Sequence, residues 1–154
     1  MMLAALLKKN PSLSGTVLEL PQVVPAARQL IEDRGLSARC EVVEGDFFEA
    51  VPEADAYLLK LILHDWNDER ATAILATCAR SLRPGGRITV IDTVVPDGST
   101  FPMPAMLDLH MRTILGGRER TAAEHEKIWT AAGLRLEQIT NTSSSAPILQ
   151  GTLA

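Results

Sequence analysis

Short aliphatic runs alternate along the chain with longer stretches in which apolar residues recur every three or four positions. Such runs are typical of strands buried on both faces, and the longer spacing is typical of amphipathic helices. Strands are predicted at residues 16–20, 40–44, 54–63 and 87–95 and, as a terminal antiparallel pair, at 134–140 and 148–153. Helices are predicted at residues 2–9, 24–34, 68–82, 103–115 and 121–132. This alternation indicates an α/β protein with a mainly parallel sheet.

Capping and helix-breaking residues support the ends of these helices. Gly35, the Arg83-Pro84-Gly85-Gly86 segment and Gly133 are each placed to end a helix. Thr121 and Glu124 have the spacing of a capping box. The apolar faces of three helices are predicted to consist of Val24, Ala27, Leu30 and Ile31; of Ala71, Ile74, Leu75, Cys78 and Leu82; and of His125, Ile128, Trp129 and Ala132.

Composition narrows the classes of protein. At 154 residues and 46 % hydrophobic content the chain fits one ordinary domain that needs no disulfide scaffold. The net charge of −4, without a basic block, argues against nucleic acid or an anionic membrane as partner. No apolar stretch approaches membrane-spanning length. Cys40 and Cys78 are far apart and lack CxxC spacing, so reduced thiols and a cytoplasmic location are expected.

The segment His64-Asp65-Trp66 lies where the third strand ends. Ligands of open α/β sheets bind at the carboxyl ends of strands, so a titratable residue here is a functional candidate. An equally good interpretation makes His64 a polar strand-end residue and Asp65 or Asp68 an N-cap.

Two acidic residues lie near other strand ends, Asp92 close to the end of the fourth strand and Glu119 just before a helix. A carboxylate beside a histidine holds it in one tautomer and makes it a better base, which suits removal of a hydroxyl proton. Without further context, a salt bridge between Glu119 and Arg118 or Arg120 is the favoured interpretation for Glu119.

Acidic residues also close the first two strands, Glu19 and then Gly45-Asp46. A nucleoside ligand needs such groups, one to accept hydrogen bonds from ribose and another to read the adenine edge. A metal site is not expected, because the chain has neither HxxxH spacing nor a Cys/His cluster.

Five segments taken in order resemble the plant caffeic acid and acetylserotonin type of small-molecule O-methyltransferase, with its bacterial relatives. They are Leu18-Glu19-Leu20-Pro21, Glu44-Gly45-Asp46-Phe47-Phe48, the run 54–69 that includes His64-Asp65-Trp66, the segment 82–87 around Pro84-Gly85-Gly86, and Gly116-Gly117-Arg118-Glu119-Arg120-Thr121. The combination of the histidine segment with the last of these is specific, whereas each single motif is not.

The resemblance implies a class I methyltransferase fold, with a Rossmann-like sheet, and transfer of a methyl group from S-adenosylmethionine to a phenolic or enolic hydroxyl of a small aromatic or polyketide-like metabolite. His64 matches the family's general base, flanked by Glu119 and by Asp92, which stands where the plant enzymes usually carry glutamate. The implied cofactor contacts are Glu19, Asp46, Phe47, Lys60 and Trp66. The implied acceptor contacts are Asp65, Met103, Met106 and Met111, and for each methionine plain helix core is as good an interpretation.

Family members carry a strand with a glycine-rich turn, and before it a helical dimerisation domain, ahead of the helix that residues 2–9 resemble. Neither occurs in these 154 residues. We therefore expect the chain alone to bind S-adenosylmethionine poorly, and the parent enzyme to be a homodimer. The alternatives are a non-catalytic fragment of such an enzyme and, less favoured without GxGxxG, a dinucleotide enzyme.

Overall fold

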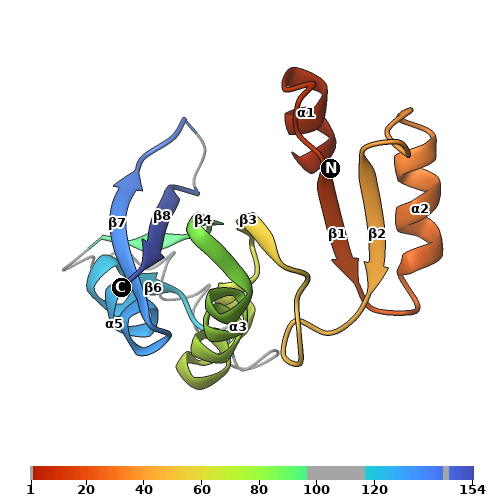
Figure 1. The fold of residues 1–154 in the computed structure, drawn as a ribbon. Coiled ribbons are helices and arrows are strands. Elements are labelled where there is room, and N and C mark those ends of the chain that lie inside the picture. The colour runs from red at the N-terminus through yellow and green to blue at the C-terminus, as the bar shows by residue number, and fades with distance from the viewer. Residues whose placement is uncertain (1, 97–116, 144–145) are drawn as a thin grey trace. The chain divides into compact units, whose positions relative to one another are not determined.

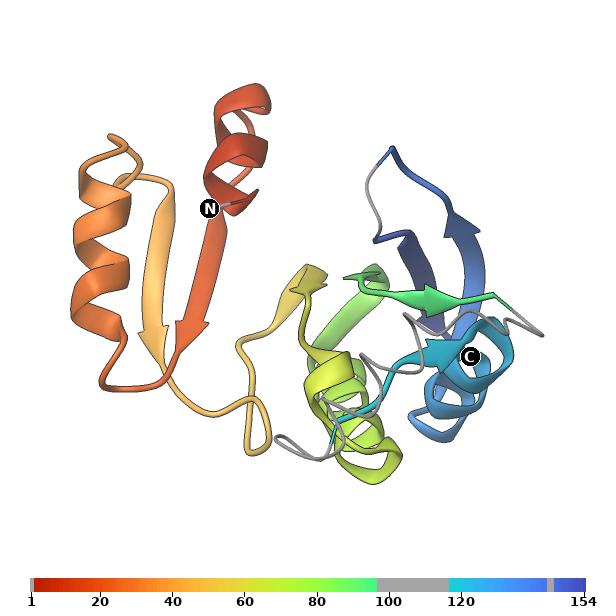
Figure 2. The ribbon, with the colours of Figure 1, turned by 180° about the vertical axis from the view of Figure 1, so that it is seen from behind.

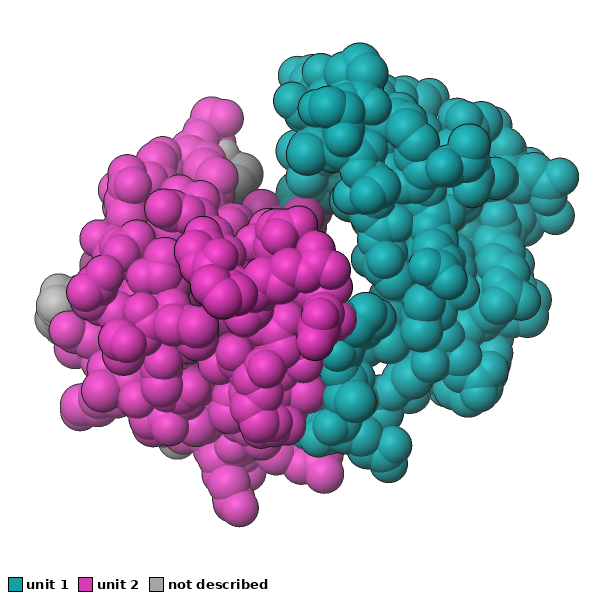
Figure 3. Space-filling model, viewed as in Figure 1, with its two compact units in different colours: residues 1–52 teal, residues 53–154 magenta. Residues whose placement is uncertain are grey.

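The computed structural model describes residues 2–96, 117–143 and 146–154. These residues form two compact units, residues 1–52 and 53–154 (Figure 3). Both units contain helices and strands, as Figures 1 and 2 show from opposite sides. The α/β class predicted from the sequence is confirmed.

The first unit contains α1 (Met2–Lys9), β1 (Gly15–Glu19), α2 (Val24–Glu32) and β2 (Cys40–Glu44). The strands β1 and β2 pair in parallel, with Glu19 opposite Glu44 at their carboxyl ends. The core of this unit comprises Ala4, Leu7, Val24, Ala27, Ile31, Leu36, Cys40 and Val42. Both helices therefore contribute apolar side chains to one core.

The second unit contains β3 (Ala54–Lys60), the 3₁₀ turn η1 (Leu63–Asp65), α3 (Asp68–Ser81), β4 (Leu82–Ile91), β5 (Val94–Val95), β6 (Arg120–Thr121), α5 (Ala122–Ala131), β7 (Leu134–Thr140) and β8 (Ile148–Leu153). Four strands form a sheet in the order β3-β4-β8-β7. The β3–β4 pair is parallel, whereas β8 pairs antiparallel with both β4 and β7. The predicted antiparallel pair at the C-terminus is thus confirmed.

Two helices of the second unit, α3 and α5, lie side by side in both views (Figures 1 and 2). Their predicted faces are buried, with Ile74, Leu75 and Trp129 fully enclosed. Burying such a side chain contributes about 1.5–3 kcal/mol. Gly151 of β8 leaves room for this core, because a Cβ there would lie 2.6 Å from the Trp129 ring.

Several predicted boundaries were wrong. The helix starting at Val24 ends at Glu32 rather than at residue 34, and Leu30 of its predicted face is 37 % exposed. The third strand ends at Lys60, because Leu61 adopts a positive φ of 53° that breaks the extended backbone. The predicted strand 87–95 is two strands, β4 and β5, separated at Asp92. The Asp92 carboxylate accepts hydrogen bonds from the backbone N–H groups of His64 and Thr93.

The N-cap of α3 is Asn67, not Asp65 or Asp68. Asn67 has an extended backbone, and its side-chain oxygen accepts a hydrogen bond from the Arg70 N–H. The predicted helix 103–115 lies outside the described residues. Among the residues that the structure does describe, no helix has the length and apolar content needed to cross a bilayer.

Candidate active site

His64 lies on the turn that follows β3. Leu61 has a left-handed backbone, which is unfavourable for a branched side chain and directs the chain out of the sheet into η1. The His64 side chain is mostly buried, with 16 % of its surface exposed. The histidine is therefore held at a strand end with limited access to solvent.

Two buried carboxylates face one side of the His64 ring. Nδ1 lies 3.7 Å from Asp92 Oδ1 and 3.6 Å from Glu119 Oε1. The Asp92 and Glu119 side chains are 1 % and 7 % exposed. Asp92 also fixes the backbone, since its Oδ2 accepts from the His64 N–H at 3.1 Å and its Oδ1 from the Thr93 N–H at 2.9 Å. The three residues predicted to work together are in fact neighbours.

Strand pairing explains why they meet. The parallel β3–β4 ladder, with Lys60 opposite Ile91, places the residues after both strands at one edge of the sheet. A second parallel pair joins Val94 to Arg120 and brings the segment containing Glu119 to the same edge. Residues far apart in sequence are thereby assembled by backbone pairing.

The carboxylates determine which ring nitrogen can act as a base. Two buried anions beside Nδ1 favour a proton on that nitrogen, which leaves Nε2 as the acceptor. Asp65 Oδ1 lies 3.4 Å from Nε2, but its side chain is 38 % exposed and its charge is therefore screened by water. Nε2 is thus the atom of His64 able to take a proton from a ligand.

The salt bridges around Glu119 differ from the interpretation favoured by the sequence. Arg118 pairs with Asp68 at 3.2 Å and with Glu124, and Arg120 pairs with Asp68 at 2.9 Å. Glu119, between the two arginines in sequence, is directed at His64.

In the first unit, the acidic strand ends are adjacent. The Gly45 N–H donates to the Glu19 carbonyl at 3.0 Å, so the ends of β1 and β2 lie next to each other. Asp46 Oδ1 accepts from the Phe48 N–H at 2.8 Å, and the Phe47 and Phe48 rings meet edge to face at 4.9 Å. Glu19 and Asp46 therefore share one rim of the unit.

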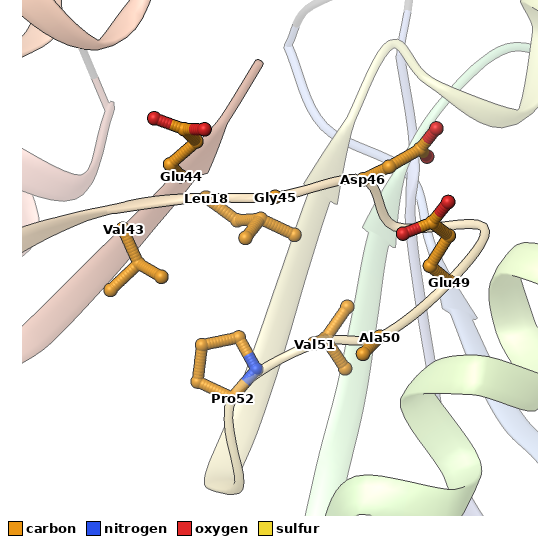
Figure 4. A pocket seen from close by; sticks show the side chains of 9 residues that line it. All are labelled: Leu18, Val43, Glu44, Gly45, Asp46, Glu49, Ala50, Val51 and Pro52. Carbon is orange, nitrogen blue, oxygen red and sulfur yellow. The ribbon is translucent and has the colours of Figure 1, made fainter. Parts of the chain in front are cut away.

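A pocket of about 360 Å³ opens beside these residues (Figure 4). This volume is within the range of small-molecule sites, roughly 300–1,000 Å³. The side chains of Leu18, Val43 and Val51 lie between two stretches of chain (Figure 4). Glu44, Asp46 and Glu49 also line the pocket, with the carboxylates of Glu44 and Asp46 directed away from these apolar side chains. Glu19 does not line this pocket.

Comparison with known proteins identifies the family: the model of the O-methyltransferase domain family matches residues 1–135. The chain belongs to this family. Its sequence is 37 % identical over 150 residues to the phenazine O-methyltransferase PhzM of Lysobacter antibioticus, covering 97 % of this chain and 44 % of the relative. It is 43 % identical over 150 residues to the aclacinomycin 10-hydroxylase RdmB of Streptomyces purpurascens, covering 95 % of this chain and 40 % of the relative.

The fold is that of class I methyltransferases. The crystal structure of the O-methyltransferase NcsB1 from neocarzinostatin biosynthesis, in complex with S-adenosylmethionine and 2-hydroxy-5-methyl naphthoic acid, aligns with a TM-score of 0.89 at 38 % identity. That alignment covers 99 % of this chain and 45 % of the other. The chain thus spans less than half the length of the relatives it matches.

In this O-methyltransferase domain, the residues predicted to contact the cofactor fall on both units. Glu19, Asp46 and Phe47 belong to the first unit, and Lys60 and Trp66 to the second. Lys60 is exposed at the end of β3, and the Arg70 guanidinium stacks 5.0 Å from the centre of the Trp66 ring. The predicted acceptor residues Met103, Met106 and Met111 lie outside the described residues. Across the described ranges, no cluster of His, Cys, Asp and Glu could hold a metal ion.

Sequence reasoning missed two residues that shape the site. Arg120 was considered only as a partner for Glu119, yet its guanidinium binds the turn carrying His64. Gly117 lies so close to that turn that a Cβ would come within 2.6 Å of the Asp65 carbonyl carbon. The signal was present in Gly116-Gly117-Arg118-Glu119-Arg120-Thr121, but the motif alone does not show what each residue touches.

Proposed function

We propose that the protein carrying this chain transfers a methyl group from S-adenosylmethionine to a hydroxyl of a small aromatic metabolite, with His64 as general base. The observation that carries the proposal is the pair of buried carboxylates facing Nδ1 of His64. That arrangement leaves Nε2 as a proton acceptor and stabilises the positive charge that the ring gains.

His64 Nε2 takes the acceptor's hydroxyl proton, so that the oxygen carries the electron pair with which it attacks. The oxygen would form its bond to the electrophilic methyl carbon that S-adenosylmethionine, when bound, supplies on its sulfonium; the carbon–sulfur bond would break with its electron pair on sulfur, and S-adenosylhomocysteine would leave. Glu119 and Asp92 hold the imidazolium until the proton is released to solvent. A base in this position contributes about 10²- to 10⁴-fold.

We infer that the first unit holds the nucleoside part of the cofactor. Asp46 is among the residues that line the pocket, and Glu19 ends the neighbouring strand β1; carboxylates at strand ends can accept hydrogen bonds from adenine and ribose groups. We assign Glu19 to the ribose, Asp46 and Phe47 to the adenine side, and Lys60 and Trp66 to further cofactor contacts. The domain assignment of residues 1–154 as part of the catalytic domain rests on the same reasoning.

The acceptor is inferred to be a hydroxylated aromatic compound. The relatives support this class, since the NcsB1 complex holds a naphthoic acid and PhzM is a phenazine O-methyltransferase. Asp65, beside Nε2 of His64, and the three predicted methionines are assigned to the acceptor side.

We also infer a homodimer and a cytoplasmic location, where the buried, unbridged Cys40 and Cys78 remain reduced.

A second candidate function follows from one relative. RdmB is named as a hydroxylase although it is 43 % identical to this chain. The second candidate reaction is therefore hydroxylation of a small aromatic metabolite, and identification of the product distinguishes it from methyl transfer.

The test incubates the protein with radiolabelled S-adenosylmethionine and a panel of phenolic polycyclic compounds. The proposal predicts label in an O-methyl product. A hydroxylated product without label would overturn it in favour of the second candidate. In parallel, titration calorimetry with S-adenosylhomocysteine tests the cofactor site.

For that titration, Glu19→Ala is expected to weaken binding by about 1.5–3 kcal/mol, the contribution of a charge-assisted hydrogen bond. Glu41→Ala is the matched control, because Glu41 is exposed and lies on β2 away from the carboxyl end. Equal affinity of the wild type and Glu19→Ala would remove Glu19 from the site.

A further inference from the structure

Arg120 is a buried cation whose hydrogen bonds converge on one turn. Its side chain is 1 % exposed. Nε donates to Asp68 Oδ1 at 2.9 Å, Nη1 to the Leu63 carbonyl at 2.9 Å, and Nη2 to the Trp66 carbonyl at 2.7 Å. Burial of a charge is unfavourable unless its donors are satisfied, so this geometry is strongly constrained.

The two carbonyls that Arg120 binds lie on either side of His64. Leu63 begins η1, and Trp66 is its C-cap. The guanidinium therefore clamps both ends of the three-residue turn from which the imidazole projects. A planar group with donors in fixed directions is suited to this task, whereas the single nitrogen of lysine is not.

The same segment supplies the carboxylate that faces the ring. Glu119, next to Arg120, lies 3.6 Å from His64 Nδ1. Gly117, two residues earlier, packs directly on the backbone of residues 64 and 65. The backbone of residues 117–120 is thus fixed against the backbone of the turn that carries His64, here called the histidine turn. This fixed backbone determines the position of Glu119 relative to the His64 ring.

We propose that Arg120 is a positioning residue: it fixes the histidine turn against the segment of Glu119 so that His64 keeps Nδ1 toward Glu119 and Asp92 and presents Nε2 to the acceptor. The catalytic part of this inference rests on the proposed function. Three carboxylates face the ring, those of Asp65, Asp92 and Glu119, while the cation of Arg120 acts on the backbone of the turn.

The test reads the tautomer of His64 directly by long-range ¹H–¹⁵N correlation spectra in alkaline buffer. The chain has three histidines, and the signal missing from His64→Gln identifies the relevant one. Wild type is expected to carry the proton on Nδ1. Arg120→Met and Arg120→Lys are both expected to shift His64 toward the Nε2–H form, because neither can hold both carbonyls.

Arg83→Met is the control. The Arg83 side chain is 51 % exposed and pairs with Asp55, so it contacts neither Asp68 nor the turn that carries His64. In Arg83→Met, the tautomer signal of His64 should equal that of wild type. Should Arg120→Met fail to fold, Asp68→Asn weakens the half-exposed anchor of Arg120 and should give a smaller shift in the same direction.

An unchanged tautomer in the folded Arg120 variants would overturn the proposal, as would full rescue by Arg120→Lys, which would show that charge alone matters. Turnover gives a separate reading: kcat of the Arg120 variants should fall by about tenfold or more, which is part of the contribution of a general base. Since the spectra require no catalysis, a protein without methyl transfer would refute the proposed function while leaving the tautomer result intact.

Discussion

His64 acquires its chemistry from groups that are buried with it. Asp92 and Glu119 lie against one ring nitrogen and are almost inaccessible to water, so their charges act on the ring with little screening. Asp65, at the other nitrogen, is partly exposed and acts more weakly. This asymmetry between the two sides of the ring is the reason for proposing Nε2 as the base.

Substitution of the two carboxylates should separate their roles. Glu119→Gln is expected to lower kcat by about ten- to a hundredfold without destabilising the fold, because Glu119 acts on the ring. Asp92→Asn should also lower the free energy of unfolding by about 1–3 kcal/mol, since Asp92 accepts two backbone hydrogen bonds while fully buried.

Denaturant unfolding and steady-state kinetics measure the two effects. Asp55→Asn is the control, because its carboxylate is 83 % exposed and pairs with Arg83 near the starts of β3 and β4, at the opposite strand ends from the turn. Equal stability of Asp92→Asn and the control would show that the backbone contacts of Asp92 do not support the site.

At the scale of elements, helix starts and strand registers place the site. The helix α5 begins with a complete capping box, in which the Thr121 hydroxyl accepts from the Glu124 N–H and the Glu124 carboxylate accepts from the Thr121 N–H. This cap directly follows Arg120 and holds the end of the segment that carries Glu119. Stability of the cap therefore bears on the geometry of the site.

The cap predicts a pH dependence. The hydrogen bond from the backbone N–H of Thr121 is the largest cause that holds the pKa of Glu124 below its usual 4.5; burial opposes it, and Arg118 lowers this pKa further. Because the pKa of Glu124 is lower in the folded than in the unfolded protein, its ionised carboxylate stabilises the fold. This contribution is fully present above pH 4.5 and is lost as the pH falls through the pKa of the folded state. Glu124→Gln should thus be less stable than wild type at neutral pH, and the difference should vanish in acid.

Thermal unfolding over a pH series measures this difference, with Glu126→Gln as the control on the exposed face of the same helix. Thr121→Ala should cost about 0.5–2 kcal/mol, as is usual for an N-cap. A pH-independent difference between Glu124→Gln and wild type would show that the charge of Glu124 does not stabilise the cap.

Periodicity and capping residues predicted most elements, because these signals are local. The α1, β2, β7 and β8 bounds match, and the capping box is formed as predicted. The breaks at Leu61 and Asp92 could not be predicted, since each depends on a contact or a backbone conformation that only the assembled sheet imposes. These two breaks are the positions that direct the chain into the site.

At the scale of the whole chain, the predicted site residues divide between two units. Motif order suggested that Glu19, Asp46 and His64 serve one reaction, and the structure places Glu19 and Asp46 in the first unit and His64 in the second. The interactions of Arg120 could not be predicted, because a buried arginine is recognised by its carbonyl partners and not by its sequence neighbours. Activity is a property proposed for the protein that carries this chain, which spans less than half of its relatives.

The central claim is that His64 removes the acceptor's proton during methyl transfer. The most direct measurement compares kcat of wild type and His64→Gln, with S-adenosylhomocysteine affinity measured on the same samples. The account predicts a loss in kcat of at least about a hundredfold, the lower end of general-base catalysis, with unchanged affinity. A His64→Gln variant that keeps more than about a tenth of wild-type kcat would contradict it, because a base of ordinary strength would then be absent from this position.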